Sequence, residues 1–387
     1  TFNTNASSSG TLTEALRIDE SGNVSVAGDI DVDGTSNLDI IDVDGAANFA
    51  ADVTFADGAD IITASAGTSN FRAGVNAGNS IASGGNYNVV VGDEAGTAIT
   101  TGNKNVAVGF QALFIDTLGQ RSVAIGHKAL NTQNFTTATD AYNTAVGDQA
   151  GKAVTTGVQN TLIGALAGDA LDTGGANIAV GYQALGADTK GGANVAIGNF
   201  ALDAQNFTTA TDAYNVAVGH LAGSAVSTGI KNVLIGGLAG DALTDADQNV
   251  AVGNLTLSAD TLGSHSVAVG NNALRRQNFT TATDTYNVAV GDDAGTQITT
   301  GIRNTLVGAL AGDALTESLL NVAVGFQSLS ADTLGSRSVA IGPFALQAQN
   351  FTTATSSYNV AVGADAGLLV TTGESNTLIG GLAGDAL

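Results

Sequence analysis

A five-residue unit recurs through most of the chain, and its spacing constrains the fold more than any other feature. Each copy has a polar residue, three residues that are apolar or Thr, and a glycine, as in Asn215 to Gly219. Seventeen copies occur, and their closing glycines are separated by 17 or 21 residues in the repeating order 17, 17, 17, 21, which makes a higher period of 72 residues. Regular self-similarity at this scale predicts a stack of similar coils in which each coil contacts only its neighbours.

The apolar part of each unit predicts a short β-strand. Its second position is Val, Ile or Thr and its fourth is Val or Ile, and β-branched side chains suit a pleated sheet better than a helix. Successive strand residues point to opposite faces, so Val216 and Val218 share one face and Ala217 takes the other. We expect Val216 and Val218 to lie in a thin core, while Gly219 lets the backbone turn.

The first position of the unit predicts a polar ladder along one corner of the stack. It is Asn in fourteen copies and Ser at Ser122, Ser266 and Ser338. Stacked coils would bring these side chains about 4.8 Å apart. We interpret the asparagines as structural, at Asn105, Asn160, Asn177, Asn194, Asn215, Asn232, Asn249, Asn287, Asn304, Asn321, Asn359 and Asn376.

The 21-residue coils contain four near-identical inserts of the type Gln-Asn-Phe-Thr-Thr. Four extra residues in a stack of fixed height must bulge outward, so we expect one row of loops, spaced every four coils. Their aromatic and polar side chains could contact a receptor glycan, or Phe135 and Tyr142 could pack back onto the roll or buttress a neighbouring chain. The candidate residues are Asn134, Phe135, Thr136, Asn206, Phe207, Thr208, Asn278, Phe279, Thr280, Asn350, Phe351 and Thr352.

Residues 1 to 70 differ from the repeat region. The segment from Leu16 to Val24 predicts short strands around a Ser-Gly-Asn turn, and strict alternation at 29–34, 41–45 and 52–58 predicts half-buried strands with an acidic outer face. The motif that starts at Asp29 resembles the beginning of a calcium loop, but its twelfth position is Ile40 where such a loop needs Glu. A solvated strand face is the favoured interpretation.

Composition disfavours several classes of function. The chain has 12 basic and 35 acidic residues, a formal net charge of −23, and basic residues that stand singly apart from Arg275-Arg276. Nucleic acids and anionic membranes are therefore not expected partners of this segment. The absence of cysteine excludes disulfides and thiolate metal sites, and we expect no metal or other cofactor.

Residues suited to catalysis are few. The three histidines, at 127, 220 and 265, have no triad-like spacing to Ser and Asp, and neighbouring carboxylates such as Asp292-Asp293 would point to opposite faces of a strand. We expect no enzyme. A tail spike that cleaves polysaccharide remains a third hypothesis behind the two structural ones given below.

The apolar content predicts association between chains. A narrow coil has few inward positions, yet pairs such as Ala184-Leu185 and Ala201-Leu202 add apolar residues on its other faces. We expect these residues to be buried between chains, and threefold symmetry would give three rolls a common core.

Stretches such as Asn177 to Leu185 and Ser122 to Gly126 resemble two related groups of proteins. One is the head domains of trimeric autotransporter adhesins, which are β-rolls in a homotrimer. The other is phage tail-fibre proteins with N-T-A-V-G-Y-Q-A-L repeats, which look closer because they share the 17-residue spacing. The resemblance covers residues 71 to 387 strongly and the first 70 weakly, and it departs from the adhesin heads in coil length.

Together, the repeats and the resemblance predict an all-β, repetitive β-roll or β-solenoid in a homotrimer that is intertwined or side by side. Residues 1–70 would form a β-strand stalk segment and residues 71–387 a β-roll shaft that continues beyond the end of the chain. The expected function is a trimeric phage tail-fibre shaft involved in host attachment, located in the virion tail fibre, with other virion proteins and a host-surface glycan or protein as partners. The alternative is a bacterial trimeric surface adhesin or extracellular filament at the cell surface.

Overall fold

The computed structural model describes residues 16–18, 24–26 and 65–387. The chain divides into two units, Thr1–Ile61 and Ile62–Leu387. In the first unit, β1 (Leu16–Ile18) and β2 (Val24–Val26) pair antiparallel, with Leu16 opposite Val26, as the sequence predicts for two strands around a turn. The alternating segments at 29–34, 41–45 and 52–58, and the motif at Asp29, lie outside the described residues.

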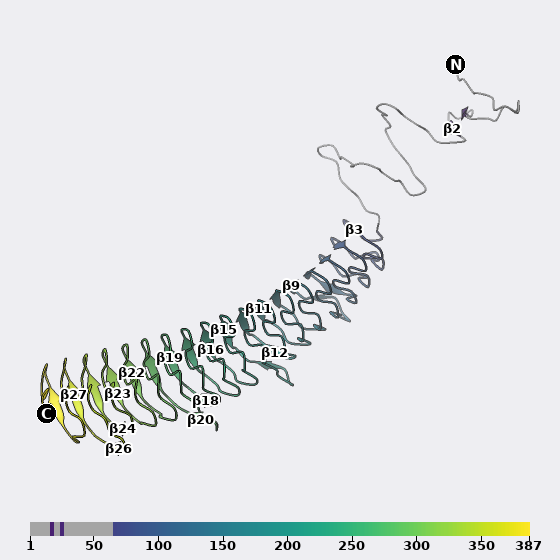
Figure 1. The fold of residues 1–387 in the computed structure, drawn as a ribbon. Helices are drawn as coiled ribbons and strands as arrows, with labels where there is room; N and C mark the ends of the chain where they lie inside the picture. Colours follow the sequence, from purple (N-terminus) through teal and green to yellow (C-terminus); the bar gives the residue numbers. More distant parts are fainter. Residues whose placement is uncertain (1–15, 19–23, 27–64) are drawn as a thin grey trace, which may run out of the picture. The chain divides into compact units, whose positions relative to one another are not determined.

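The second unit is a parallel β-solenoid of eighteen stacked strands (Figure 1), which confirms the predicted fold class. Each coil contributes one three-residue strand to a single sheet. The strands are β3 (Phe71–Ala73), β4 (Val89–Val91), β5 (Val106–Val108), β7 (Val123–Ile125), β9 (Thr144–Val146), β10 (Thr161–Ile163), β11 (Ile178–Val180), β13 (Val195–Ile197), β15 (Val216–Val218), β16 (Val233–Ile235), β17 (Val250–Val252), β19 (Val267–Val269), β21 (Val288–Val290), β22 (Thr305–Val307), β23 (Val322–Val324), β25 (Val339–Ile341), β27 (Val360–Val362) and β28 (Thr377–Ile379).

The pairing of these strands follows the repeat without a slip. Val216 lies opposite Val195 on one side and Val233 on the other, so the 21-residue and 17-residue steps keep the same register. The sheet is open at both ends, because β3 pairs only with β4 and β28 only with β27. A hydrogen-bonded sheet thus runs the full length of the stack.

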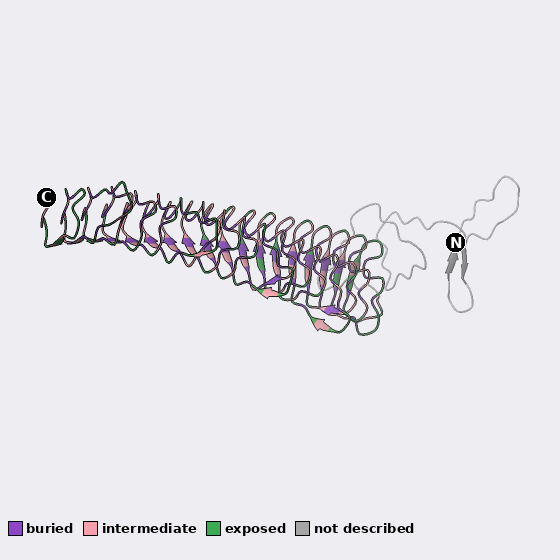
Figure 2. Cartoon of the chain, turned by 90° about the horizontal axis from the view of Figure 1, so that it is seen from below, coloured by how far each residue is buried: buried purple, intermediate pink, exposed green. Residues whose placement is uncertain are grey.

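Each insert adds a second, shorter parallel pair beside the main sheet (Figure 2). Its final residues pair with the preceding coil, as when Thr139 and Asp140 lie opposite Gly119 and Gln120. The pairs are β6 (Gly119–Gln120) with β8 (Thr139–Asp140), β12 (Gly191–Gly192) with β14 (Thr211–Asp212), β18 (Gly263–Ser264) with β20 (Thr283–Asp284), and β24 (Gly335–Ser336) with β26 (Thr355–Ser356).

The strands face the opposite way from the sequence-based expectation. Ala217 is fully buried, whereas Val216 and Val218 are only partly covered and lie on the outer face. The same pattern holds in the other repeats, where Ile125, Ile163 and Ile235 are each 38 to 39 % exposed. The placement of Val216 and Val218 in the core was therefore wrong. The interior of one coil is narrow, and it accepts the single middle residue of each strand, mostly Ala and in some coils Leu, rather than two β-branched side chains.

Side-chain volumes inside the stack are matched from coil to coil. Where the middle strand residue is Leu162, the opposite side of the coil carries Gly168, and a Cβ at that glycine would lie 2.8 Å from both Leu162 Cδ2 and Leu171 Cδ1. Where the middle strand residue is Ala179, the opposite position is Leu185. In these two coils a leucine on one wall therefore faces a small residue on the other.

The alanine-leucine pairs also differ from expectation. Ala184, Leu185, Ala201 and Leu202 are fully buried inside their own coils. They follow Gly181 and Gly198, where the chain turns back towards the interior, and they form the wall opposite the strands. Their burial needs no second chain, so the argument that placed them between chains was wrong.

Candidate functional site

The four inserts bury their aromatic residue and expose their threonines. Phe135, Phe207, Phe279 and Phe351 are 5 to 7 % exposed. The two residues after each phenylalanine are exposed, as Thr208 and Thr209 are. Phenylalanine in these loops is therefore buried against the stack, while the threonines that follow it reach solvent.

The loop asparagines hold the insert to the preceding coil. Asn206 Oδ1 accepts a hydrogen bond of 3.0 Å from Thr189 Oγ1, and the backbone oxygen of Phe207 accepts a second, of 2.9 Å, from the same hydroxyl. The equivalent contacts occur from Thr117 to Asn134, from Thr261 to Asn278 and from Thr333 to Asn350. The amide oxygens of these asparagines are thus occupied within the chain.

A buried glutamine and aspartate lie beneath each loop. Gln133 donates to Asp116 Oδ2 over 2.6 Å and to Ser122 Oγ over 3.0 Å, and its Oε1 accepts from Asn143 Nδ2 at 2.8 Å. Asp116 Oδ1 also accepts from the Gly119 and Phe135 amides. Burial raises the pKa of Asp116, and these hydrogen bonds act in the opposite direction. Sequence reasoning missed this glutamine, although it recurs at the start of each insert.

The asparagines of the repeat form runs of a hydrogen-bonded ladder inside the corner, which are interrupted at Ser122, Ser266 and Ser338. Asn215 Oδ1 accepts from the Asn232 backbone amide at 2.9 Å, while Asn215 Nδ2 donates to the Gly229 oxygen at 2.7 Å and to Gln205 Oε1 at 2.8 Å. Both Asn215 and Asn232 are fully buried. These side chains lock one coil to the next, and a buried amide with every bond made is not available to a ligand.

The residue just before each ladder position is the most exposed polar feature of the corner. In the 21-residue coils it is Tyr142, Tyr214, Tyr286 or Tyr358, each about half exposed and with a φ of 51 to 53° that turns its side chain away from the interior. Sequence reasoning missed this column. The sequence did contain a signal for this column, because the position before each ladder residue carries tyrosine or a basic residue in many copies of the repeat.

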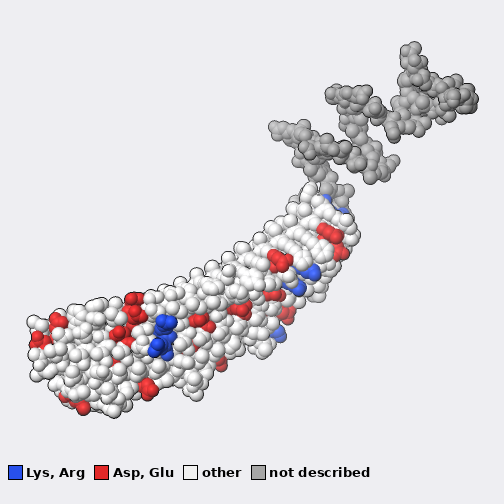
Figure 3. All heavy atoms as spheres, in the orientation of Figure 1, with Lys and Arg blue, Asp and Glu red and all other residues white. Residues whose placement is uncertain are grey.

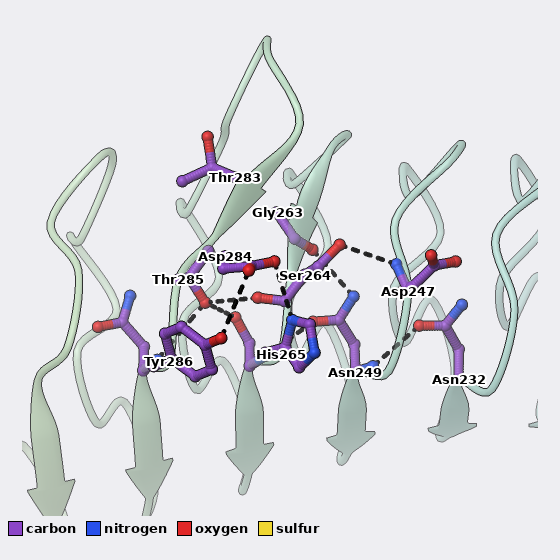
Figure 4. A network of polar contacts seen from close by, with 12 residues as sticks. Asn232, Asp247, Asn249, Gly263, Ser264, His265, Thr283, Asp284, Thr285 and Tyr286 are labelled. Carbon is purple, nitrogen blue, oxygen red and sulfur yellow. Dashed lines mark hydrogen bonds and ion pairs between the residues drawn. The ribbon is translucent and has the colours of Figure 1, made fainter.

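Tyr286 lies in a small polar cluster with His265 and Asp284 (Figure 4). His265 Nδ1 is 3.0 Å from Asp284 Oδ1, the rings of His265 and Tyr286 are 5.2 Å apart, and the Tyr286 hydroxyl donates to Asp284 Oδ2 at 3.4 Å. The equivalent cluster at Tyr142 has Arg121 in place of the histidine, with its guanidinium 5.7 Å from the ring centre and 2.9 Å from Asp140.

The histidine cluster lacks the geometry of a hydrolytic triad. The Ser264 hydroxyl accepts a hydrogen bond from the Asp247 amide at 2.9 Å, and the His265 ring bonds to Asp284 rather than to a hydroxyl group (Figure 4). In residues 65–387 no group of three or more His, Asp or Glu side chains is placed to hold a metal ion. Among the described residues there is also no helix that could cross a membrane.

Charged side chains are sparse over the visible face of the solenoid (Figure 3). Two aspartates, Asp241 and Asp313, each have an Oδ1 atom that is buried without a hydrogen-bond partner, and burial raises the pKa of both carboxyl groups.

Comparison with known proteins adds no further evidence, since no family model, curated protein or solved structure matches the chain.

Proposed function

We propose that this chain is the structural and adhesive shaft of a fibre, most specifically a homotrimeric phage tail fibre involved in host attachment, with no enzymatic role of its own. The observation that carries the proposal is the uninterrupted stack of eighteen hydrogen-bonded coils in one register. At about 4.8 Å per coil the stack spans roughly 80 to 90 Å. Such a unit resists bending, because every inner coil is tied to both neighbours by the sheet and most neighbouring coils are also joined by the asparagine ladder.

The outer face of the main sheet supports assembly into a trimer. Its two columns hold the second and fourth residues of the repeat, and none of the 36 residues in these columns from β3 to β28 is charged. Four are threonines, at 144, 161, 305 and 377, and nearly all the rest are valine or isoleucine. A flat, uncharged, β-branched surface is poorly suited to remain in water along a whole fibre.

The size of this face matches a stable interface. A strip roughly 85 Å long and on the order of 10 Å wide has an area of about 850 Å². Monomeric proteins rarely expose a continuous apolar patch of more than about 300 to 600 Å², and a standard interface buries about 800 Å² on each partner. Three copies can turn this face toward a common axis, with identical coil spacing keeping their side chains in step.

The oligomeric state tests this part of the proposal. We expect light scattering of the purified chain to give three times the 38.1 kDa of one chain. Replacing Val218, Val252 and Val290 together by lysine places three charges on the sheet face and should yield monomers. Thr209→Lys on an exposed loop adds charge elsewhere and should leave the trimer intact. A monomeric mass for the unmodified chain would refute the trimer.

The biological setting needs a separate test. Antibodies raised against a peptide with the exposed loop sequence from 206 to 212 should label tail fibres on virions in electron micrographs. Labelling of bacterial cell surfaces in place of virions would favour the adhesin alternative.

A further inference from the structure

We propose that the tyrosine column binds an acidic polysaccharide laid along the fibre, which extends the proposed function by naming a ligand class and a site. The column consists of the residues that precede each ladder position from Tyr87 to Ser375, and all of them except Ala193 and His265 are exposed. Its tyrosines are Tyr87, Tyr142, Tyr214, Tyr286 and Tyr358.

The column is rich in basic residues, although the chain as a whole is acidic. Of the 12 lysines and arginines in the chain, five lie among its seventeen positions, together with His265, and none of the seventeen is acidic. The five are Lys104, Arg121, Lys231, Arg303 and Arg337. Because only 12 of the 387 residues are basic, fewer than one would fall among seventeen positions by chance, so five are a marked local enrichment.

Each tyrosine has a cationic neighbour one coil away. Arg121 and Arg337 lie over the rings of Tyr142 and Tyr358, each at 5.7 Å from the ring centre. On the following coil, the backbone amides of Lys231 and Arg303 donate to the carbonyl oxygens of the residues just before Tyr214 and Tyr286, which places the backbones of these two cationic residues one coil from the tyrosines. Each of the column's tyrosines therefore has a cationic residue at an adjacent position of the column.

Several of these cations are not neutralised by the chain. Within residues 65–387, the ion pairs involve Arg121, His127 and His265, so Lys231, Arg303 and Arg337 keep their charge available. At the fourth corner, Ser356 occupies the position of Asp140 and Asp284. Arg337 consequently has no carboxylate there to pair with.

Nearby carboxylates reduce the positive charge at some of the tyrosine corners. Asp140 and Asp284 pair with Arg121 and His265, and Asp212 stands two residues before Tyr214 in the same position of its insert, so the first three corners are less positive than the fourth. A tyrosine edge with a neighbouring cation suits a sugar ring that carries a carboxylate: the ring packs on the aromatic surface and the cation pairs with the acid. Successive corners are four coils apart, about 19 Å, so one extended chain can reach several of them.

The net charge of the chain does not oppose this contact at physiological salt. At an ionic strength of 0.15 M the screening length is about 8 Å. Charges on other faces of the coil are then largely screened, and the local groups dominate. Binding through several weak corners gains avidity that one corner lacks.

The test uses the full chain in 0.15 M salt and measures its binding to immobilised polygalacturonate, alginate and polysialic acid. We expect at least one acidic polymer to bind. Fully methyl-esterified polygalacturonate, which has the same sugar without the charge, and single-stranded DNA should bind at least about tenfold more weakly. Replacing Tyr142, Tyr214, Tyr286 and Tyr358 by alanine should weaken binding about 100-fold through loss of avidity. Arg337→Glu should weaken it as well.

Two controls separate the site from the fold and from the fibre proposal. Replacing Thr137, Thr209, Thr281 and Thr353 by alanine changes four exposed loop residues, and these variants should bind as the unmodified chain does. The mass of every variant is measured in parallel. If the chain is a trimer and binds none of the three acidic polymers, the binding site is refuted and the fibre proposal stands. If the chain binds an acidic polymer as a monomer, the binding site stands and the trimeric fibre is refuted. Equal binding to the esterified polymer or to DNA, or undiminished binding by the alanine variant, also overturns the binding site.

Discussion

The asparagine ladder makes a quantitative prediction from one chemical change at two positions. Asn215→Ser removes the side chain that accepts from the Asn232 amide and donates to Gly229 and Gln205. Asn194→Ser makes the same change one coil earlier. There the chain already carries Gln205, the counterpart of the Gln133 that accompanies Ser122.

The two variants should differ in stability because they leave different numbers of buried groups without partners. Asn215→Ser leaves the Gly229 oxygen, the Gln205 amide oxygen and the Asn232 amide unpaired in a fully buried corner. Gln205 cannot turn to compensate, since its Nε2 is held by Asp188 at 2.7 Å. At about 1 to 3 kcal/mol for each of these three unsatisfied groups, the loss is roughly 3 to 9 kcal/mol. Asn194→Ser recreates the Ser-Gln arrangement of three other coils and should cost about 1 kcal/mol or less.

Hydrogen exchange measured by mass spectrometry suits this comparison, because a repeat protein can open locally without unfolding as a whole. Peptides covering residues 213–236 should exchange much faster in Asn215→Ser, while those covering 323–346 stay unchanged. The same peptides in Asn194→Ser should resemble the unmodified chain. Equal protection in the two variants would show that the ladder bonds do not hold the coils together.

Three further predictions concern the core, the loops and pH. Gly168→Ala should lower the denaturant midpoint, because the added Cβ meets Leu162 and Leu171 at 2.8 Å and sits at a φ of +56°, and adding Leu162→Ala should recover part of the loss; no recovery would contradict the volume matching. Phe207→Ala should cost about 3 to 5 kcal/mol locally and speed exchange across residues 205–213, whereas Thr209→Ala should not. Burial raises the pKa of five aspartates above the ordinary value of 3.8, namely Asp116, Asp169, Asp203, Asp241 and Asp313. At pH values above 3.8 the folded chain therefore binds more protons at these groups than the unfolded chain does. Stability should therefore rise as pH falls from neutrality toward that value, although Asp148, with a pKa lowered by Gln149 and His127, contributes in the opposite direction. A midpoint that falls steadily from pH 7 to 5 would contradict this reasoning, and Asp241→Asn with Asp313→Asn should flatten the dependence.

The sequence by itself determined the stack, its register and the partners of each column. The spacing of 17 and 21 residues is enough to place Val195, Val216 and Val233 side by side, because a solenoid has one chain path per coil and equivalent residues must align. It also placed Asn194, Asn215 and Asn232 in one column, and it located the inserts. Period-two alternation further required Ala217 to face away from Val216 and Val218.

Only the tertiary structure decided which of those two faces is inside. Alternation fixes which residues share a face, but the choice between faces depends on the width of the coil. That width is set by distant residues: Leu162 fits because Gly168 lies across from it, and Ala179 is matched by Leu185. The ladder asparagines and Gln133 also occupy buried positions, where their hydrogen bonds join neighbouring coils. Because Ala217 is inside, the valines and isoleucines form the outer face of the sheet, and the tyrosines at the corner point to solvent.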